Sequence, residues 1–160
     1  MILPGPAFPP VNGPAAKSLC TGILLLALVM PSAASAAESA LTVSDAWIRM
    51  IVPSRPAAGY FTVSNAGDSA IDLTGASSSA CASLMLHRSV EENGIGKMMM
   101  VDKVPVPAKG SAAFAPGGYH LMCMSPSTAV TPGATVPVTL SFSNGKSRTV
   151  DFAVKGATGE

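Results

Sequence analysis

The chain has few charged residues and few of the side chains that usually bind metals. Of its 160 residues only 12% are charged, two are histidine and three are cysteine. No basic cluster is present, which argues against nucleic acid or an anionic surface as partner. No Cys-x-x-Cys pair occurs, so a thiolate metal site is not indicated. A His-Glu-x-x-His motif, a His/Asp/Ser set and paired carboxylates are also missing, so we expect no enzyme activity.

The first residues have the features of an export signal. Lys17 precedes an unbroken apolar run over residues 22–30, which is shorter than the roughly 20 apolar residues that span a bilayer. Small residues follow, and Ala34-Ser-Ala36 fits the cleavage rule for secretory signal peptides. We therefore predict a signal peptide over residues 1–36 that is cleaved after Ala36 or Ala37. An uncleaved membrane anchor is the alternative, because the segment before the apolar run is long.

Residues 37–160 then form one domain of ordinary size. Cys20 precedes the apolar run, where a lipidated cysteine would not stand, and we expect it to leave with the signal. The remaining two cysteines, Cys81 and Cys123, enter an oxidising compartment where they can form a disulfide. The sequence alone does not determine whether they do.

From Leu41 onward the pattern predicts short strands separated by tight turns. Alternating apolar residues, β-branched residues and Gly, Pro, Asn and Asp recur at short intervals, and no stripe of helical period is sustained. The Asn144-Gly145 pair, flanked by alternating apolar residues, predicts a hairpin. About eight or nine strands indicate an all-β sandwich or barrel with Greek-key connections. The predicted strands are 42–50, 59–64, 71–77, 83–89, 97–101, 111–114, 119–124, 136–142 and 148–154, and the predicted core aromatics are Trp47, Tyr60, Phe61, Phe114, Phe142 and Phe152.

One stretch, Met85 to Met124, concentrates side chains that bind soft metals. It holds both histidines, His87 and His120, and six of the nine methionines. Because strand side chains alternate between faces, His120, Met122 and Met124 share a face and Cys123 takes the other. Met85 and His87 project together in the same way, as do Met98 and Met100.

If these segments meet, two imidazoles and at least two thioethers converge. Both are neutral donors, and thioether sulfur is soft and polarisable, which suits Cu(I) better than Zn, Ca or Mg. Thioethers also remain available in an oxidising compartment, where cysteine pairs are lost to disulfides. Methionine is a common core filler as well, so Met85, Met99 or Met124 taken singly is better explained as core.

The arrangement of these residues resembles the periplasmic copper(I) chaperones of the PCuAC type. His87 is followed after ten residues by Met98, after twenty-one more by His120, and then by Met122. The flanking segments Ser44-Asp-Ala-Trp-Ile-Arg49, Ala58-Gly-Tyr-Phe61 and Pro116-Gly-Gly-Tyr-His-Leu-Met122 agree, and the similarity covers about Leu41 to Val154. Arg88 and Cys123 depart from the residues common at their positions.

This resemblance implies a cupredoxin-like sandwich in the periplasm that binds one Cu(I) through His87, Met98, His120 and Met122. It also implies delivery of the ion to the Cu-A centre of a respiratory oxidase, directly or through a thiol-bearing carrier. We expect a monomer that meets the membrane only through its acceptor. Whether Met85, Met99, Met100 or Met124 serves as a spare ligand is open.

Two other functions compete with a copper carrier. A blue-copper electron carrier would need a cysteine just ahead of its second histidine, whereas Cys123 follows His120 and no later histidine exists. A metal-free sandwich that binds a partner would not depend on His120.

Overall fold

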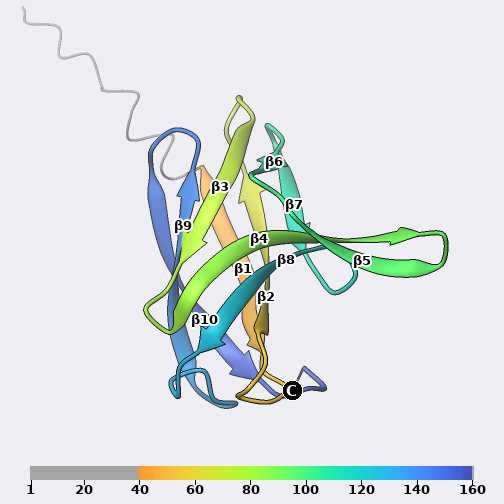
Figure 1. Cartoon of the computed structure of the whole chain (residues 1–160). Coiled ribbons are helices and arrows are strands. Elements are labelled where there is room, and N and C mark those ends of the chain that lie inside the picture. The colour runs from red at the N-terminus through yellow and green to blue at the C-terminus, as the bar shows by residue number, and fades with distance from the viewer. Residues whose placement is uncertain (1–39, 160) are drawn as a thin grey trace, which may run out of the picture. The chain divides into compact units, whose positions relative to one another are not determined.

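The computed structural model describes residues 40–159, and this part of the chain is built from strands connected by turns and loops (Figure 1). Among these residues no helix is long and apolar enough to cross a membrane. The predicted signal peptide lies outside the described residues. The ten strands are β1 (Leu41–Arg49), β2 (Ala57–Asn65), β3 (Ile71–Ser77), β4 (Cys81–Glu92), β5 (Ile95–Met100), β6 (Val104–Val106), β7 (Gly110–Phe114), β8 (Tyr119–Pro126), β9 (Thr135–Phe142) and β10 (Ser147–Lys155).

The all-β sandwich predicted from the sequence is confirmed, with one strand more than expected. All ten strands belong to one hydrogen-bonded sheet in the order β5-β4-β8-β7-β2-β1-β10-β9-β3-β6, with a further pairing of β8 with β2. The sheet curls over, so that β3 and β6 at one end of this order lie near β4 and β7. The additional strand is β6, whose three residues Val-Pro-Val pair with β3. A segment this short leaves too little alternation to recognise.

The core lies inside the curled sheet. It is filled by the alternate residues of each strand whose side chains point inward. In β9, Val136, Val138, Leu140 and Phe142 are buried while the residues between them are more exposed. Phe61 is at the centre of the aromatic part of this core. Its ring stacks on Phe114 with centroids 4.3 Å apart and meets the edge of Phe152 at 5.6 Å. Five of the six aromatics predicted for the core, all but Trp47, are buried.

Trp47 is an exception, because it is only partly buried and lies outside the core. The register of β1 with β2 shifts between Ser44 and Trp47, and Asp45 there has a positive φ of 53°. Such a bulge changes the face to which the following side chains point. Trp47 packs instead on Tyr60, with ring centroids 4.8 Å apart, and Arg49 donates a hydrogen bond of 2.9 Å to the Tyr60 hydroxyl.

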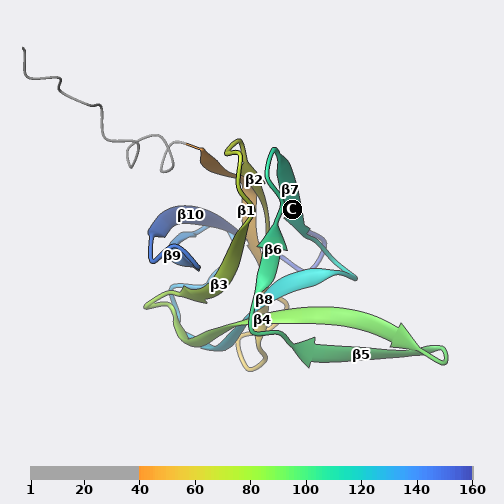
Figure 2. The ribbon, with the colours of Figure 1, turned by 90° about the horizontal axis from the view of Figure 1, so that it is seen from above.

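The hairpin of β4 and β5 extends away from the rest of the domain (Figures 1 and 2). Its two-residue turn is Asn93-Gly94, and both residues have positive φ, 56° and 77°. This is the geometry of a type I′ turn, which Asn-Gly favours and which matches the twist of the flanking strands. A tight turn keeps the two strands paired to their ends, so β5 stays in fixed register with β4.

A disulfide joins Cys81 of β4 to Cys123 of β8. Both cysteines are buried and belong to the hydrophobic core. The bond links two strands that are already paired along their length, and the loop that it closes, with a sequence separation of 42, contains His87, Met98 and His120.

Replacing both cysteines, Cys81→Ala together with Cys123→Ala, should lower the stability of the domain. A loop of this length restricts the unfolded chain by about 4 kcal/mol in the chain-entropy relation. We expect a correspondingly lower midpoint in urea unfolding followed by circular dichroism. Ser83→Ala, at an exposed position of the same strand β4, is the control and should unfold like the parent chain. A double variant as stable as that control would contradict the expectation.

Candidate metal centre

The four residues of the predicted ligand set come from three neighbouring strands. β5, β4 and β8 lie side by side at one end of the sheet order. In this register His87 is opposite His120 of β8 and opposite Met100 of β5. Met85 is opposite Met122, and Met98 is opposite Ser89.

These pairings place all four residues on one face. Directly opposite residues in an antiparallel pair project from the same side of the sheet, and so do residues two apart in one strand. His87, Met98, His120 and Met122 are therefore on the same side. The residues between them, Leu86, Leu121 and Cys123 among them, point to the other side and are buried in the core.

The two imidazole rings are neighbours across the β4–β8 pair. Their centroids are 5.8 Å apart and their planes are tilted by 60°. His120 is buried, with 4% of its surface exposed. Its Nδ1 is 3.2 Å from the carbonyl oxygen of Gly118. Because a carbonyl only accepts, Nδ1 carries the proton, and the lone pair of a neutral His120 is on Nε2. Metal-binding histidines commonly have their other ring nitrogen held in this way.

The turn before β8 positions that carbonyl. Gly118 N donates to Ala115 O at 3.0 Å, and Gly117 has a φ of 82°. With Pro116 ahead of it, this is a type II turn, which favours proline and then glycine at its two central positions. The Gly118 carbonyl also accepts a hydrogen bond of 3.0 Å from Ser89 N of β4. The Pro116-Gly-Gly segment was noted above only as part of the resemblance, and its role in holding the His120 ring was not predicted.

His87 has a buried ring nitrogen that is free to bind a ligand. Its Nδ1 has no hydrogen-bond partner within the described part of the chain. Burial lowers the pKa of His87 below its usual 6.5, and the neighbouring His120 lowers it further. Both effects disfavour the charged imidazolium. His87 is thus a neutral donor at neutral pH, and a buried nitrogen without a partner fits a metal ion.

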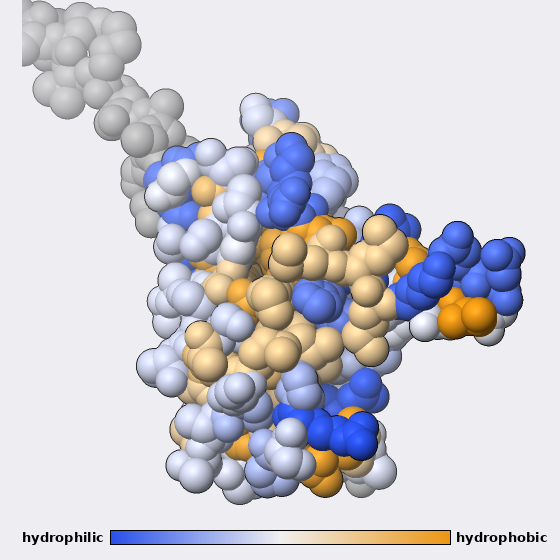
Figure 3. Space-filling model, viewed as in Figure 1, coloured by the Kyte–Doolittle hydropathy of each residue, from blue (hydrophilic) through white to orange (hydrophobic). Residues whose placement is uncertain are grey.

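The methionines beside the histidines face solvent rather than the core. Met98 is 65% exposed and Met100 is 63% exposed, and Met85, Met122 and Met124 are half-buried. Figure 3 shows pale orange surface around a small blue spot on the face where the β4–β5 hairpin joins the domain. Of the methionines in residues 40–159, Met50 belongs to the core. The core explanation for Met85, Met99 and Met124 is therefore wrong.

Two residues of the same hairpin point away from this face. Met99 is opposite Arg88 in the β4–β5 pair, and Arg88 is opposite Tyr119 of β8. The Arg88 guanidinium lies over the Tyr119 ring, 5.3 Å from its centroid. Met99 is thus separated from the histidines by the sheet, and Arg88 does not interfere with the donor set.

The possible donors on this face are nitrogen and thioether sulfur. Within residues 40–159, no group of three or more His, Cys, Asp or Glu side chains comes together. An oxygen-rich or thiolate-rich centre is thus not formed in this part of the protein. Two neutral imidazoles with neutral thioethers suit a soft monovalent ion.

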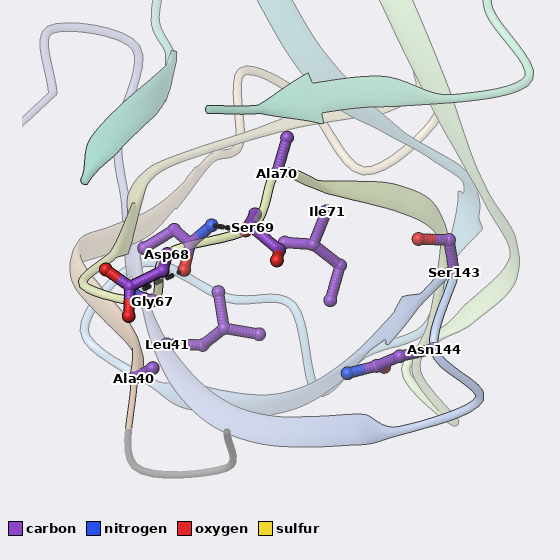
Figure 4. A pocket seen from close by; sticks show the side chains of 10 residues that line it. Ala40, Leu41, Gly67, Asp68, Ser69, Ala70, Ile71, Ser143 and Asn144 are labelled. Atoms are coloured by element: carbon purple, nitrogen blue, oxygen red, sulfur yellow. Dashed lines mark hydrogen bonds between the residues drawn. The ribbon is translucent and has the colours of Figure 1, made fainter. Parts of the chain in front are cut away.

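A cavity of about 680 Å³ lies elsewhere, among the loops that follow β2 and β9 (Figure 4). Asn65 braces one side of it by donating to Ser69 O and accepting from Gly67 N. Leu41 and Ile71 supply apolar surface. The described residues that line it include no histidine, methionine or cysteine, and so they offer no donor for a soft metal.

Comparison with known proteins identifies the family. Residues 41–154 match the family described as "Putative lipoprotein LpqE-like". The chain belongs to the LpqE-like family. A Leifsonia xyli subsp. xyli protein named "Putative lipoprotein Lxx21020" is 36% identical over 118 residues, which are 73% of this chain and 70% of the relative. An uncharacterized protein of Rickettsia prowazekii, RP573, is 26% identical over 74% of this chain and 68% of its own length.

Solved structures share the fold of this LpqE-like chain. The Cu(I) form of DR1885 from Deinococcus radiodurans is 32% identical and has a TM-score of 0.57, over 69% of this chain and 74% of that chain. The copper-bound PCuAC domain from PmoF2 has a TM-score of 0.62 at 24% identity, over 73% of this chain and 93% of that domain. The similarity to PCuAC-type proteins noted from the sequence is confirmed.

The lowered pKa of His87 predicts its behaviour in the metal-free protein. Nuclear magnetic resonance of the ring protons should give a pKa below 6.5 for His87 in the folded protein. At pH 6.5 half of the His87 side chains are protonated in the unfolded protein, but fewer than half are protonated in the folded protein. Because the unfolded state then binds more protons, stability should fall as the pH drops from 6.5 toward the lower native pKa. A His87 pKa at or above 6.5 would contradict the burial of its ring.

Proposed function

We propose that this LpqE-like protein is a copper carrier that holds one Cu(I) ion between His87, Met98, His120 and Met122. The observation that supports this most is the pair of imidazoles fixed opposite each other on β4 and β8. The Gly118 carbonyl accepts a hydrogen bond from Nδ1 of His120, which leaves the lone pair of Nε2 for a ligand. His87 has a buried ring nitrogen without a partner among the described residues. Exposed thioethers complete a set of neutral donors.

The placement of the donors suits release as well as binding. The histidines are on strands that pair on both sides, whereas Met98 is on β5, the outermost strand, whose six residues are all exposed. A thiolate or imidazole of an acceptor can approach from the β5 side and replace the Met98 thioether. The ion then passes by ligand exchange, without any change in its charge, and no catalysed reaction is required.

A blue-copper electron carrier is disfavoured by the state of the cysteines. Such a centre needs a cysteine thiolate. Cys123 is bonded to Cys81 and buried in the core, on the side of the sheet opposite the histidines. Among the described residues no other cysteine is present.

Export and delivery complete the proposal. The family description and the name of the Leifsonia relative both contain the word lipoprotein, which supports an exported protein. Residues 1–36 are proposed as its cleaved signal peptide, with residues 37–160 as the periplasmic domain. The Cu(I) form of DR1885 supports the choice of ion. We propose that the protein acts as a monomer and that its acceptor is the Cu-A site of a respiratory oxidase or a thiol-bearing carrier.

Replacing two proposed ligands, Met98→Leu together with Met122→Leu, should abolish retention of Cu(I). Leucine conserves volume and loses the sulfur donor, so the fold should persist. Metal analysis after gel filtration should give about one copper per chain for the parent and almost none for the variant. Met99→Leu, on the opposite face, is the matched control and should retain the ion. Equal retention by both variants would contradict the proposed ligand set.

Acid should release the ion, because only a neutral imidazole binds metal. In competition with a Cu(I) chelator, affinity should be constant near neutral pH and should fall below about pH 6, past the unperturbed histidine range. The lowered pKa of His87 shifts its own part of this loss to lower pH. Affinity that stays flat well below about pH 6 would argue against histidine ligation.

A further inference from the structure

The face that carries the histidines has a second group of soft donors. We propose that Met85, Met122 and Met124 form an additional, weaker binding site for Cu(I), here called the thioether station, next to the histidine pair. This inference builds on the proposed function, because Met122 is also assigned to the histidine site. It adds a position from which the ion enters or leaves that site.

The strand register brings these three sulfurs together. Met85 of β4 is directly opposite Met122 of β8, and Met124 is two residues further along β8, opposite Ser83. Side chains that are opposite or diagonal on one face of an antiparallel pair are within reach of each other, and long side chains most easily. The three methionines therefore occupy neighbouring positions on the face that carries the His87–His120 pair. Met98 and Met100 lie on the other side of β4, on β5.

These methionines are not part of the hydrophobic core. Each is half-buried on the outer face, and none belongs to the hydrophobic core or to the apolar residues packed against it. Alternate residues of the same strands, Leu84, Leu86 and Cys123, fill that core. Three long apolar side chains thus lie together at the surface, although they contribute nothing to the core. Metal binding accounts for their position.

The chemistry of the station selects one class of ion. Three neutral thioethers offer polarisable sulfur and no charge, which suits Cu(I) or Ag(I) and not Zn²⁺, Mg²⁺ or Ca²⁺. The lack of imidazole makes the station weaker than the histidine site. Since Met122 is common to both, the ion can keep its bond to that sulfur while the bonds to Met85 and Met124 break and those to His87 and His120 form. Electrons and charge are unchanged in this exchange.

A titration with Ag(I), a redox-stable ion of the same class, tests the proposal on the intact protein. Methionine methyl groups labelled with carbon-13 report each sulfur separately by nuclear magnetic resonance. The first equivalent should shift Met98 and Met122 together with both imidazoles. The second should shift the methyl groups of Met85 and Met124 and should shift Met122 a second time, because its sulfur is shared by the two sites, with a dissociation constant at least tenfold weaker than the first.

The variant Met85→Leu with Met124→Leu should lose the second event and keep the first. Leucine fills the same volume at half-buried positions, and an unchanged circular dichroism spectrum verifies folding. Met99→Leu should keep both events. Second-equivalent shifts at Met99 or Met100 alone, or none at all, would overturn the thioether station and leave the proposed function standing. Failure of the first equivalent to shift the imidazoles would instead reject the histidine site.

Discussion

The pairing of β4 with β8 is the constraint on which the candidate metal centre depends. Side chains alternate with a period of two, so a slip of one residue would exchange the two faces of a strand. Leu86, Leu121 and Cys123 are buried in the core, and their burial fixes the register. The same register places His87 opposite His120. Burial of apolar side chains on one face thereby positions the imidazoles on the other.

The disulfide reinforces this arrangement from the core side. Cys81 and Cys123 join the two strands that carry both histidines and Met122. The type II turn ending at Gly118 adds a local constraint, because its carbonyl holds both the Ser89 amide and the His120 ring. The histidine half of the site is thus determined by packing, a covalent bond and hydrogen bonds together.

The methionine half is built differently. Met98 and Met100 are exposed on the outermost strand, and Met85, Met122 and Met124 are half-buried on the outer face. The imidazoles are held in place by the fold, whereas the thioethers are accessible. The first property favours retention of the ion and the second favours its release, and a carrier needs both. Neutral donors also allow the ion to be exchanged without burying a net negative charge, which is costly in a dry site.

The sequence by itself determined the strand pattern, because alternation and turn residues are local signals, and most predicted strands lie within a few residues of those observed. It also determined which residues are soft donors and, through their spacing, the similarity to PCuAC-type proteins. Only the tertiary structure decided that Cys81 bonds to Cys123, that Met100 rather than Met98 is directly opposite His87, and that Met99 is on the opposite face. These outcomes depend on the register between strands that are distant in the chain. That register is set by how all the core residues pack together, and a local sequence pattern holds no information about this packing.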